Sequence, residues 1–109
     1  MKRLAVAVAL VASACTPAQI AAWAAAHPRP GGFLACVRQH ESGGDYRAEN
    51  PTSSASGAYQ FLDSTWRTVS ASAGHPSGHA AYAAPWVQDA VAVWTVNHVG
   101  RSPWAGTGC

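Results

Sequence analysis

The sequence predicts a small, mostly α-helical single domain with about three main helices and a loop and short-strand region between the first two. The chain has 109 residues, which is enough for one domain. Hydrophobic residues make up 49% of it and charged residues 11%, as in a compact globule and unlike a disordered chain. Its many alanines favour helix over sheet. These observations set the fold class before any motif is considered.

Residues 1–14 show the three-part pattern of an export signal. The basic pair Lys2-Arg3 precedes an apolar run over residues 4–14, which ends in the small residues Ala12-Ser13-Ala14. The run is too short for a transmembrane helix, which needs roughly 20 apolar residues. We therefore expect residues 1–14 to be a cleaved signal peptide and the protein to be exported.

The end of this signal has two alternatives. Cys15 follows the small residues directly, as in a lipoprotein signal, although such signals usually carry Leu where this chain has Ala12. Cleavage after Ala26 would instead extend the signal to residue 26. Otherwise, residues 15–32 predict a short helix with Thr16 and Pro17 at its start, followed by a Pro- and Gly-rich linker.

The cysteines predict one disulfide in an exported protein. If Cys15 is removed or lipidated, Cys36 and Cys109 remain as a pair. Their bridge would tie the first helix of the domain to the end of the chain. In the chain-entropy model a loop of that length contributes roughly 4 kcal/mol, and a domain this small needs such a bond.

Helical spacing and helix-end residues place the three main helices. The first covers about residues 33–41 and stops at the glycine-rich 42–44. The second covers about 64–73, with Asp63 or Ser64 as its N-cap. The third starts at Pro85 and ends before Gly100. Its predicted buried stripe consists of Val87, Ala90, Val91 and Trp94.

Glu41 is the chemically notable residue of the first helix. Phe33, Leu34 and Val37 share one face, and Glu41 is the next i+4 position on it. Desolvation and the negative end of the helix dipole would both raise the pKa of this carboxyl group, as a general acid requires. The alternative is a solvated Glu at a frayed helix end, and periodicity alone leaves both interpretations open.

Charge removes one class of partner. The formal net charge is +2, but without Lys2 and Arg3 five basic residues face five acidic ones. A nearly neutral domain lacks the basic surface that nucleic acids attract. We expect no nucleic-acid partner.

Metal and cofactor sites are not predicted. Cys36 and His40 are four residues apart, as are His75 and His79, but the second pair lies in a Pro-Gly loop and Cys36 is assigned to the disulfide. The sequence has no Gly-x-Ser-x-Gly elbow and no phosphate-binding glycine loop. We expect neither a metal nor a cofactor.

Several spaced motifs carry a resemblance to a known family. They are the run 41–46 (ESGGDY), Asn50-Pro51, the run 57–61 (GAYQF) and Ser64-Thr65-Trp66. Together they resemble the resuscitation-promoting-factor or transglycosylase-like domain of actinobacteria and, more distantly, the lytic transglycosylases. The resemblance covers about residues 34–109, and the family's disulfide also joins a Cys shortly before the Glu to one at the C-terminus. It implies an α+β lysozyme-like fold with a saccharide groove, and a catalytic domain over residues 33–109.

The resemblance also implies roles for individual residues. Glu41 matches the family's catalytic Glu, and four further residues match positions that line the groove: Gln60, Thr65, Trp66 and Gln88. Aromatic rings can stack on sugars, which makes Tyr46, Tyr59 and Trp66 candidates, with core packing as the alternative. For Trp86, Trp94 and Trp104 we expect core packing.

The implied activity is cleavage of peptidoglycan at the β-1,4 bond between N-acetylmuramic acid and N-acetylglucosamine. No second carboxylate is persuasive, because Asp45 lies in a loop, Asp63 suits an N-cap and Asp89 suits the first turn of the third helix. Glu41 would then act alone, as in a lytic transglycosylase or a muramidase. The alternative is a peptidoglycan-binding or signalling module that does not cleave. We expect a monomer that is secreted or at the cell wall.

Overall fold

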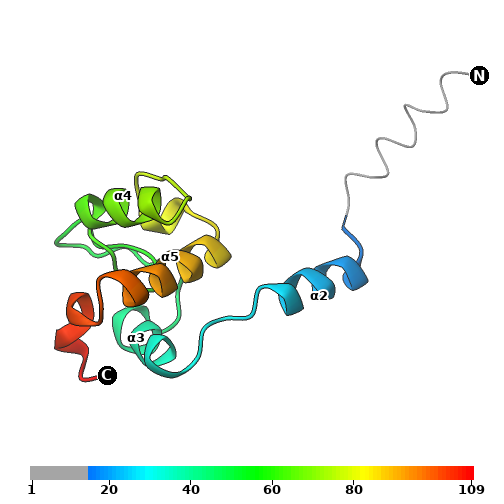
Figure 1. Ribbon diagram of the computed structural model, residues 1–109, viewed down its shortest axis with the longest axis horizontal. Helices are drawn as coiled ribbons and strands as arrows, with labels where there is room; N and C mark the ends of the chain where they lie inside the picture. Colours follow the sequence, from blue (N-terminus) through cyan, green and yellow to red (C-terminus); the bar gives the residue numbers. More distant parts are fainter. Residues whose placement is uncertain (1–14) are drawn as a thin grey trace, which may run out of the picture.

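The computed structural model describes residues 15–109 and confirms a small, mostly helical fold (Figure 1). Its elements in chain order are α2 (Pro17–Ala26), α3 (Gly32–Ser42), α4 (Asp63–Ser72), the 3₁₀ helix η1 (Ala80–Tyr82), α5 (Pro85–His98) and the 3₁₀ helix η2 (Ser102–Thr107). Within this range the predicted short strands are reduced to two isolated antiparallel bridges, which join Ser56 to Glu49 and to Phe61. The expected signal peptide, residues 1–14, lies outside the described residues. No helix from residue 15 onward is long and apolar enough to cross a membrane.

Helix α2 forms where the cap residues predict it. The Thr16 side chain accepts the backbone N–H of Gln19, the Gln19 side chain accepts the backbone N–H of Thr16, and Pro17 occupies the first turn. None of its residues is buried. An extended linker joins it to the other helices (Figure 1).

Helix α3 carries its apolar side inward and ends at a glycine, as predicted. Leu34 and Val37 are buried. Gly43 has a left-handed backbone, with φ 64°, and its N–H donates to the carbonyl of Gln39, while the N–H of Gly44 donates to that of Arg38. A glycine suits this left-handed position because it has no Cβ. The turn therefore fixes where α3 ends, directly after Glu41 and Ser42.

The predicted N-cap of α4 is wrong. Leu62 occupies the cap position without a side-chain cap bond, and Asp63 is the first residue of the helix. The Asp63 carboxylate lies 2.6 Å from Nδ1 of His79 instead, so an ion pair takes the place of a backbone cap. Ser64 is likewise inside the helix.

Helix α5 has the predicted start and end, but its buried face differs from the predicted apolar stripe. Val91 is buried, whereas Val87, Ala90 and Trp94 are only partly buried. The buried positions are Gln88, Asp89, Val91, Ala92 and Thr95. The helix-dipole argument had placed Asp89 in the first turn of this helix, but it lies beyond that turn. The difference arises because polar partners on neighbouring segments face α5, so its inward side is partly polar.

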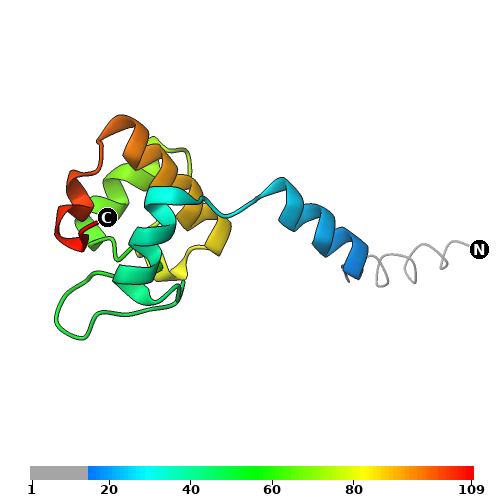
Figure 2. The ribbon, with the colours of Figure 1, turned by 90° about the horizontal axis from the view of Figure 1, so that it is seen from below.

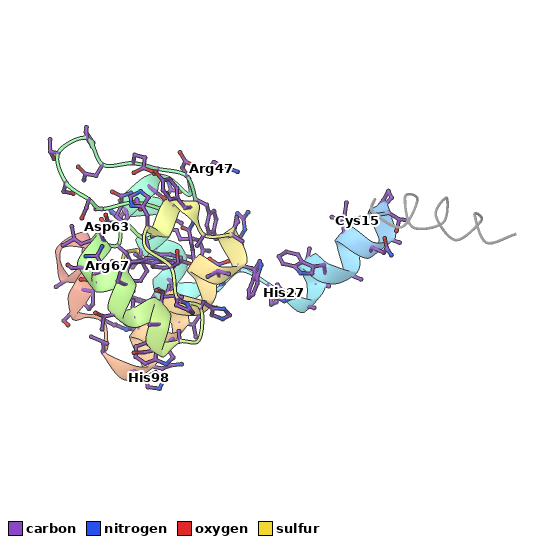
Figure 3. All side chains as sticks on the ribbon, turned by 90° about the horizontal axis from the view of Figure 1, so that it is seen from above. Cys15, His27, Arg47, Asp63, Arg67 and His98 are labelled. Carbon is purple, nitrogen blue, oxygen red and sulfur yellow. A yellow bond between two sulfur atoms is a disulfide. The ribbon has the colours of Figure 1, made fainter. Side chains whose placement is uncertain are left out.

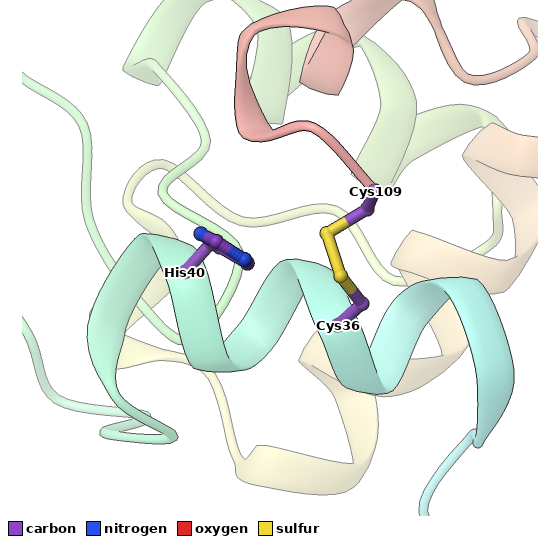
Figure 4. Close-up of side chains that lie close together, drawn as sticks. All are labelled: Cys36, His40 and Cys109. Atoms are coloured by element: carbon purple, nitrogen blue, oxygen red, sulfur yellow. A yellow bond between two sulfur atoms is a disulfide. The ribbon is translucent and has the colours of Figure 1, made fainter.

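The predicted disulfide is present and closes the domain. Cys36 on α3 and Cys109 at the chain end are joined, with their Cα atoms 5.9 Å apart (Figure 4). Just before the chain end, the buried Trp104 of η2 donates from Nε1 to the carbonyl of Tyr59. The C-terminal segment is thus attached to α3 covalently and to the core by packing.

The long connection between α3 and α4, drawn in green, extends away from the helices and then returns to the core (Figure 2). Its inner end is a tight turn in which Ser56 and Phe61 exchange backbone hydrogen bonds of 3.1 Å. Gly57 opens this turn with φ 80°, and its N–H donates to the carbonyl of Ala48 at 2.8 Å. We call residues 56–61 the core turn. It lies against both α3 and α5 through the contacts described below.

Replacing Gly57 by Ala is expected to destabilise the domain strongly. A Cβ at this position would lie 2.4 Å from Oε1 of Gln88, a buried and hydrogen-bonded side chain, and φ 80° is unfavourable for alanine. We expect the free energy of unfolding to fall by about 2–4 kcal/mol, measured by urea denaturation.

Gly78→Ala is the matched control, because a Cβ there meets nothing within 4 Å and no left-handed φ is required. Its effect should stay within about 0.5 kcal/mol. Equal stability of the two variants would contradict this account of the core turn.

Candidate active site

Glu41 lies in the last turn of α3, one residue before its end. It is partly buried, and burial raises the pKa of its carboxyl group above the ordinary value of 4.5, while the adjacent His40 acts in the opposite direction. Within the described part of the chain its carboxylate has no hydrogen bond and no ion pair. Glu41 therefore combines the two properties of a general acid, a proton held to higher pH and an uncommitted side chain.

The other four acidic side chains are all engaged. Asp45 accepts the N–H of Arg47, Glu49 and Asp63 both contact His79, and Asp89 accepts two tyrosine hydroxyls. Of the five, only Glu41 has no hydrogen-bond or ion-pair partner within residues 15–109. Among the described carboxylates, Glu41 is therefore the one that is free to act as the single catalytic group expected from the sequence.

Asp89 is the centre of a buried polar network. The hydroxyls of Tyr46 and Tyr59 each donate to its Oδ1 at 2.6 Å, and Nη1 of Arg38 donates to the Tyr59 hydroxyl at 2.9 Å. Burial, followed by the hydrogen bond to Asp89, raises the pKa of Tyr46 to about 12 and raises that of Tyr59 as well. Both tyrosines thus stay protonated and act as donors at neutral pH. The network joins α3, the loop after it, the core turn and α5.

Gln88, predicted to line the groove, is buried in the same region. Its Oε1 accepts the N–H of Ala58 at 2.9 Å, and its Nε2 donates to the carbonyls of Tyr46 at 2.9 Å and Ala83 at 3.0 Å. With 1% of its surface exposed, it has no free group for a ligand. The structure gives it the task of holding the core turn against α5.

Ser42, the residue after Glu41, is also bound to the core turn. The hydroxyl of Ser42 donates to the carbonyl of Ala58 at 2.9 Å, and the N–H of Gly44 donates to the Ser42 oxygen. The backbone on the C-terminal side of Glu41 is therefore fixed by side-chain bonds as well as by the glycine turn. Such support is what a reacting group needs in order to keep one position.

The aromatic candidates for sugar stacking lie in the core. Tyr59 and Trp66 have no exposed surface and Tyr46 has 7%. The ring of Trp66 packs 5.3 Å from that of Phe61, and its Nε1 has no hydrogen-bond partner in the described residues. Their faces are covered by protein, so core packing is the role that the structure shows. Among the predicted core tryptophans, Trp104 is buried, and Trp86 and Trp94 are partly buried.

Gln60 and Thr65 are the predicted groove residues that solvent reaches in part. Gln60 adopts a left-handed backbone, with φ 52°, and its Nε2 donates to the carbonyl of Gly57. Thr65 lies in the first turn of α4. A separate hollow of about 440 Å³ is lined by Tyr46, Arg47 and residues 81–85; Figure 3 labels Arg47 on the loop.

The structure brings Cys36, His40 and Cys109 together, with their potential ligand atoms within 4.8 Å of one another (Figure 4). The two sulfur atoms form the disulfide and are therefore not thiolate ligands. In the other predicted pair, His79 is held by Asp63 and Glu49, and the ring of His75 packs edge-on against Trp86. The two cysteines, His75 and His79 thus each have a structural role, and His40 is exposed beside the disulfide.

With the site in place, comparison with known proteins decides the family. The profile of the transglycosylase-like domain matches residues 33–107, most of the chain. The chain belongs to the transglycosylase-like domain family. This confirms the resemblance seen in the motifs around Glu41.

Two curated relatives of this transglycosylase-like chain come from staphylococci. It is 49% identical over 72 residues to the "probable transglycosylase SceD 3" of Staphylococcus saprophyticus, which covers 65% of the chain and 29% of the relative. The "probable transglycosylase SceD" of Staphylococcus aureus strain Newman is 48% identical over 68 residues, 62% of the chain and 29% of the relative. The chain spans less than a third of the length of these relatives. No solved structure matches it significantly.

Sequence reasoning missed two parts of this transglycosylase-like domain. One is the Arg38–Tyr59–Asp89 network, for which the available signal was a lone Asp inside an otherwise uncharged helix. The other is the bridge from His79 to Glu49 and Asp63, whose residues are too far apart in the sequence for any spacing rule. Both depend on contacts between distant segments.

The His79 bridge predicts a pH-dependent stability. Its Nδ1 lies 2.6 Å from Asp63 and its Nε2 2.8 Å from Glu49, and the hydrogen bond to Asp63 is the main cause that raises the His79 pKa above 6.5. A raised folded-state pKa gives stability that is fully present below the unfolded pKa and lost as pH rises through the folded pKa. We expect the wild-type free energy of unfolding, measured in urea, to fall as the pH rises from below 6.5 through the raised His79 pKa, and His79→Gln to reduce that fall.

His98→Gln is the control, because His98 is an exposed histidine at the end of α5 that contacts no carboxylate of residues 15–109 (Figure 3). It should keep the wild-type pH dependence. If His79→Gln keeps it too, the bridge does not contribute to stability.

Proposed function

We propose that this domain cleaves the glycan strands of peptidoglycan at the β-1,4 bond between N-acetylmuramic acid and N-acetylglucosamine, with Glu41 as its single catalytic carboxyl group. The observation that carries the proposal is the unpaired, partly buried Glu41 with a raised pKa, in a chain of the transglycosylase-like family. The names of the curated relatives, "probable transglycosylase", support the same class of reaction.

The first step uses the protonated form of Glu41. Its proton passes to the glycosidic oxygen while the bond from that oxygen to C1 of the muramic acid breaks, which leaves positive charge on the sugar ring. A carboxyl group with an ordinary pKa would be ionised near neutral pH and unable to donate. The raised pKa of Glu41 keeps a larger share of it in the acid form.

The second step uses the carboxylate that remains. It takes a proton from the oxygen that attacks C1, and this oxygen belongs either to water or to the 6-hydroxyl of the same muramic acid. Water gives a reducing end and the 6-hydroxyl gives a 1,6-anhydro end. Because the four other carboxylates are engaged elsewhere, Glu41 performs both proton transfers in this scheme.

The remaining expectations form part of this proposal. Residues 33–109 are the catalytic domain, and the protein acts as a monomer. The signal at residues 1–14 directs its export. Its substrate then lies in the cell wall. Gln60 and Thr65 are the proposed groove residues that solvent reaches, and their amide and hydroxyl groups suit hydrogen bonds to sugar and N-acetyl groups.

Glu41→Gln tests the proposal directly. The amide keeps the size of the side chain but cannot donate the proton, so release of soluble muropeptides from purified peptidoglycan should fall by roughly 10²–10⁴-fold. In the wild type the rate should fall as pH rises through the raised Glu41 pKa, because the acid form is lost. Mass spectrometry of the products measures the release and identifies anhydro or reducing ends.

Asp45→Asn is the matched control, since Asp45 is an exposed carboxylate four residues further along. It should release muropeptides at the wild-type rate. No release by the wild type, with binding to peptidoglycan intact, would favour the non-cleaving module. Full activity of Glu41→Gln would exclude Glu41 as the acid.

A further inference from the structure

Arg38 lies three residues before Glu41 on α3, a spacing at which oppositely charged side chains on one helix can pair. The two form no ion pair in the described structure. Burial and His40 account for the pKa of Glu41, and Arg38 is not among its causes. A cation that could neutralise Glu41 is therefore close in sequence but directed elsewhere.

The Tyr59 hydroxyl is what holds Arg38. Nη1 of Arg38 donates to the Tyr59 oxygen at 2.9 Å, and the guanidinium carbon lies 5.7 Å from the centre of the Tyr59 ring. The single hydroxyl proton of Tyr59 goes to Asp89 at 2.6 Å, so its oxygen is left to accept from Arg38. Hydrogen bonds that share one hydroxyl polarise each other, which strengthens the hold on the guanidinium.

Asp89 supplies the charge behind this hold. Asp89 is 7% exposed, and it accepts a second hydroxyl hydrogen bond, from Tyr46. A buried carboxylate without a compensating cation is costly, and Arg38 compensates it through the shared tyrosine. Arg38 thus has two reasons to point toward α5 and away from Glu41: a hydrogen-bond acceptor and a negative charge.

We propose that Tyr59 and Asp89 are positioning residues that keep Arg38 away from Glu41, so that Glu41 stays unpaired and able to carry its proton. The inference rests on the proposed role of Glu41 as the acid. The ionisable groups linked to this end of α3 are His40 and Arg38 on the helix, Tyr46 on the following loop, Tyr59 on the core turn and Asp89 on α5. Arg29, before α3, also faces the network, with its guanidinium carbon 4.9 Å from the centre of the Tyr46 ring. In this arrangement the network affects Glu41 indirectly, because it binds Arg38 and so prevents Arg38 from pairing with Glu41.

Tyr59→Phe is the decisive variant. It keeps the buried ring and removes only the hydroxyl, which frees Arg38 to pair with Glu41. We expect the Glu41 pKa, measured by carboxyl-carbon NMR titration, to fall by about half a unit, because an opposite charge favours the ionised form. The basic limb of the muropeptide-release profile should move to lower pH by the same amount. Adding Arg38→Met to Tyr59→Phe should return the Glu41 pKa to at least its wild-type value.

Tyr46→Phe is the matched control, since it removes the other tyrosine bond to Asp89 but leaves Arg38 bound to Tyr59. The Glu41 pKa should then stay at its wild-type value. If Tyr59→Phe does not fold, Asp89→Asn removes the negative charge with the same expected direction of shift. An unchanged Glu41 pKa in the folded variant, or an equal shift in Tyr46→Phe, would overturn the inference.

The NMR titration reports on Glu41 whether or not the protein cleaves peptidoglycan. A pKa shift without any wild-type muropeptide release would therefore support the positioning network while the proposed function fails. Muropeptide release that depends on Glu41, with no pKa shift in Tyr59→Phe, would show the opposite.

Discussion

The buried carboxylate of Asp89 is the constraint on which the rest of this small domain depends. Two tyrosine hydroxyls and, through one of them, an arginine on α3 converge on it. A charge in the interior must be compensated, so the segments that carry these partners cannot drift apart without exposing it unpaired. Gln88 next to it holds the core turn and the loop after α3 by backbone bonds. Gln88 and Asp89 of α5 thus position the loop after α3 and the core turn.

The disulfide and this network stabilise different parts of the same helix. Cys36 ties the middle of α3 to the chain end, whereas Arg38 and Ser42 tie its last turns to the core turn. A domain this small can bury only a limited apolar core, and covalent and polar attachments add to its stability. Because they act on both sides of the candidate acid, Glu41 is held on a rigid part of the fold although it lies near a helix end.

The sequence was sufficient for the features that depend on neighbouring residues. Local rules predict the end of α3 at Gly43, the start of α5 at Pro85 and the capping of α2 by Thr16, and simple counting predicts the cysteine pairing. The structure confirms all four. The sequence was insufficient where a distant residue competes for a side chain. Asp63 looked like a cap because a local rule fits it, but His79 takes its carboxylate. Trp66 matched a groove position and Tyr59 was a candidate for stacking on sugars, yet only the packed structure shows that their rings are covered.

The same distinction applies to Glu41. Helical periodicity placed it on the inward side of α3, and the structure agrees that it is partly buried. Within residues 15–109, however, Glu41 has no partner, whereas each of the other four carboxylates contacts a histidine, a tyrosine or a backbone amide. This difference becomes visible only when all five are compared in the structure. Arg38 is the cation best placed by sequence to pair with Glu41, and it is committed to the network around Asp89. The proposed role of Glu41 as the acid therefore depends as much on where its neighbours are bound as on its own position.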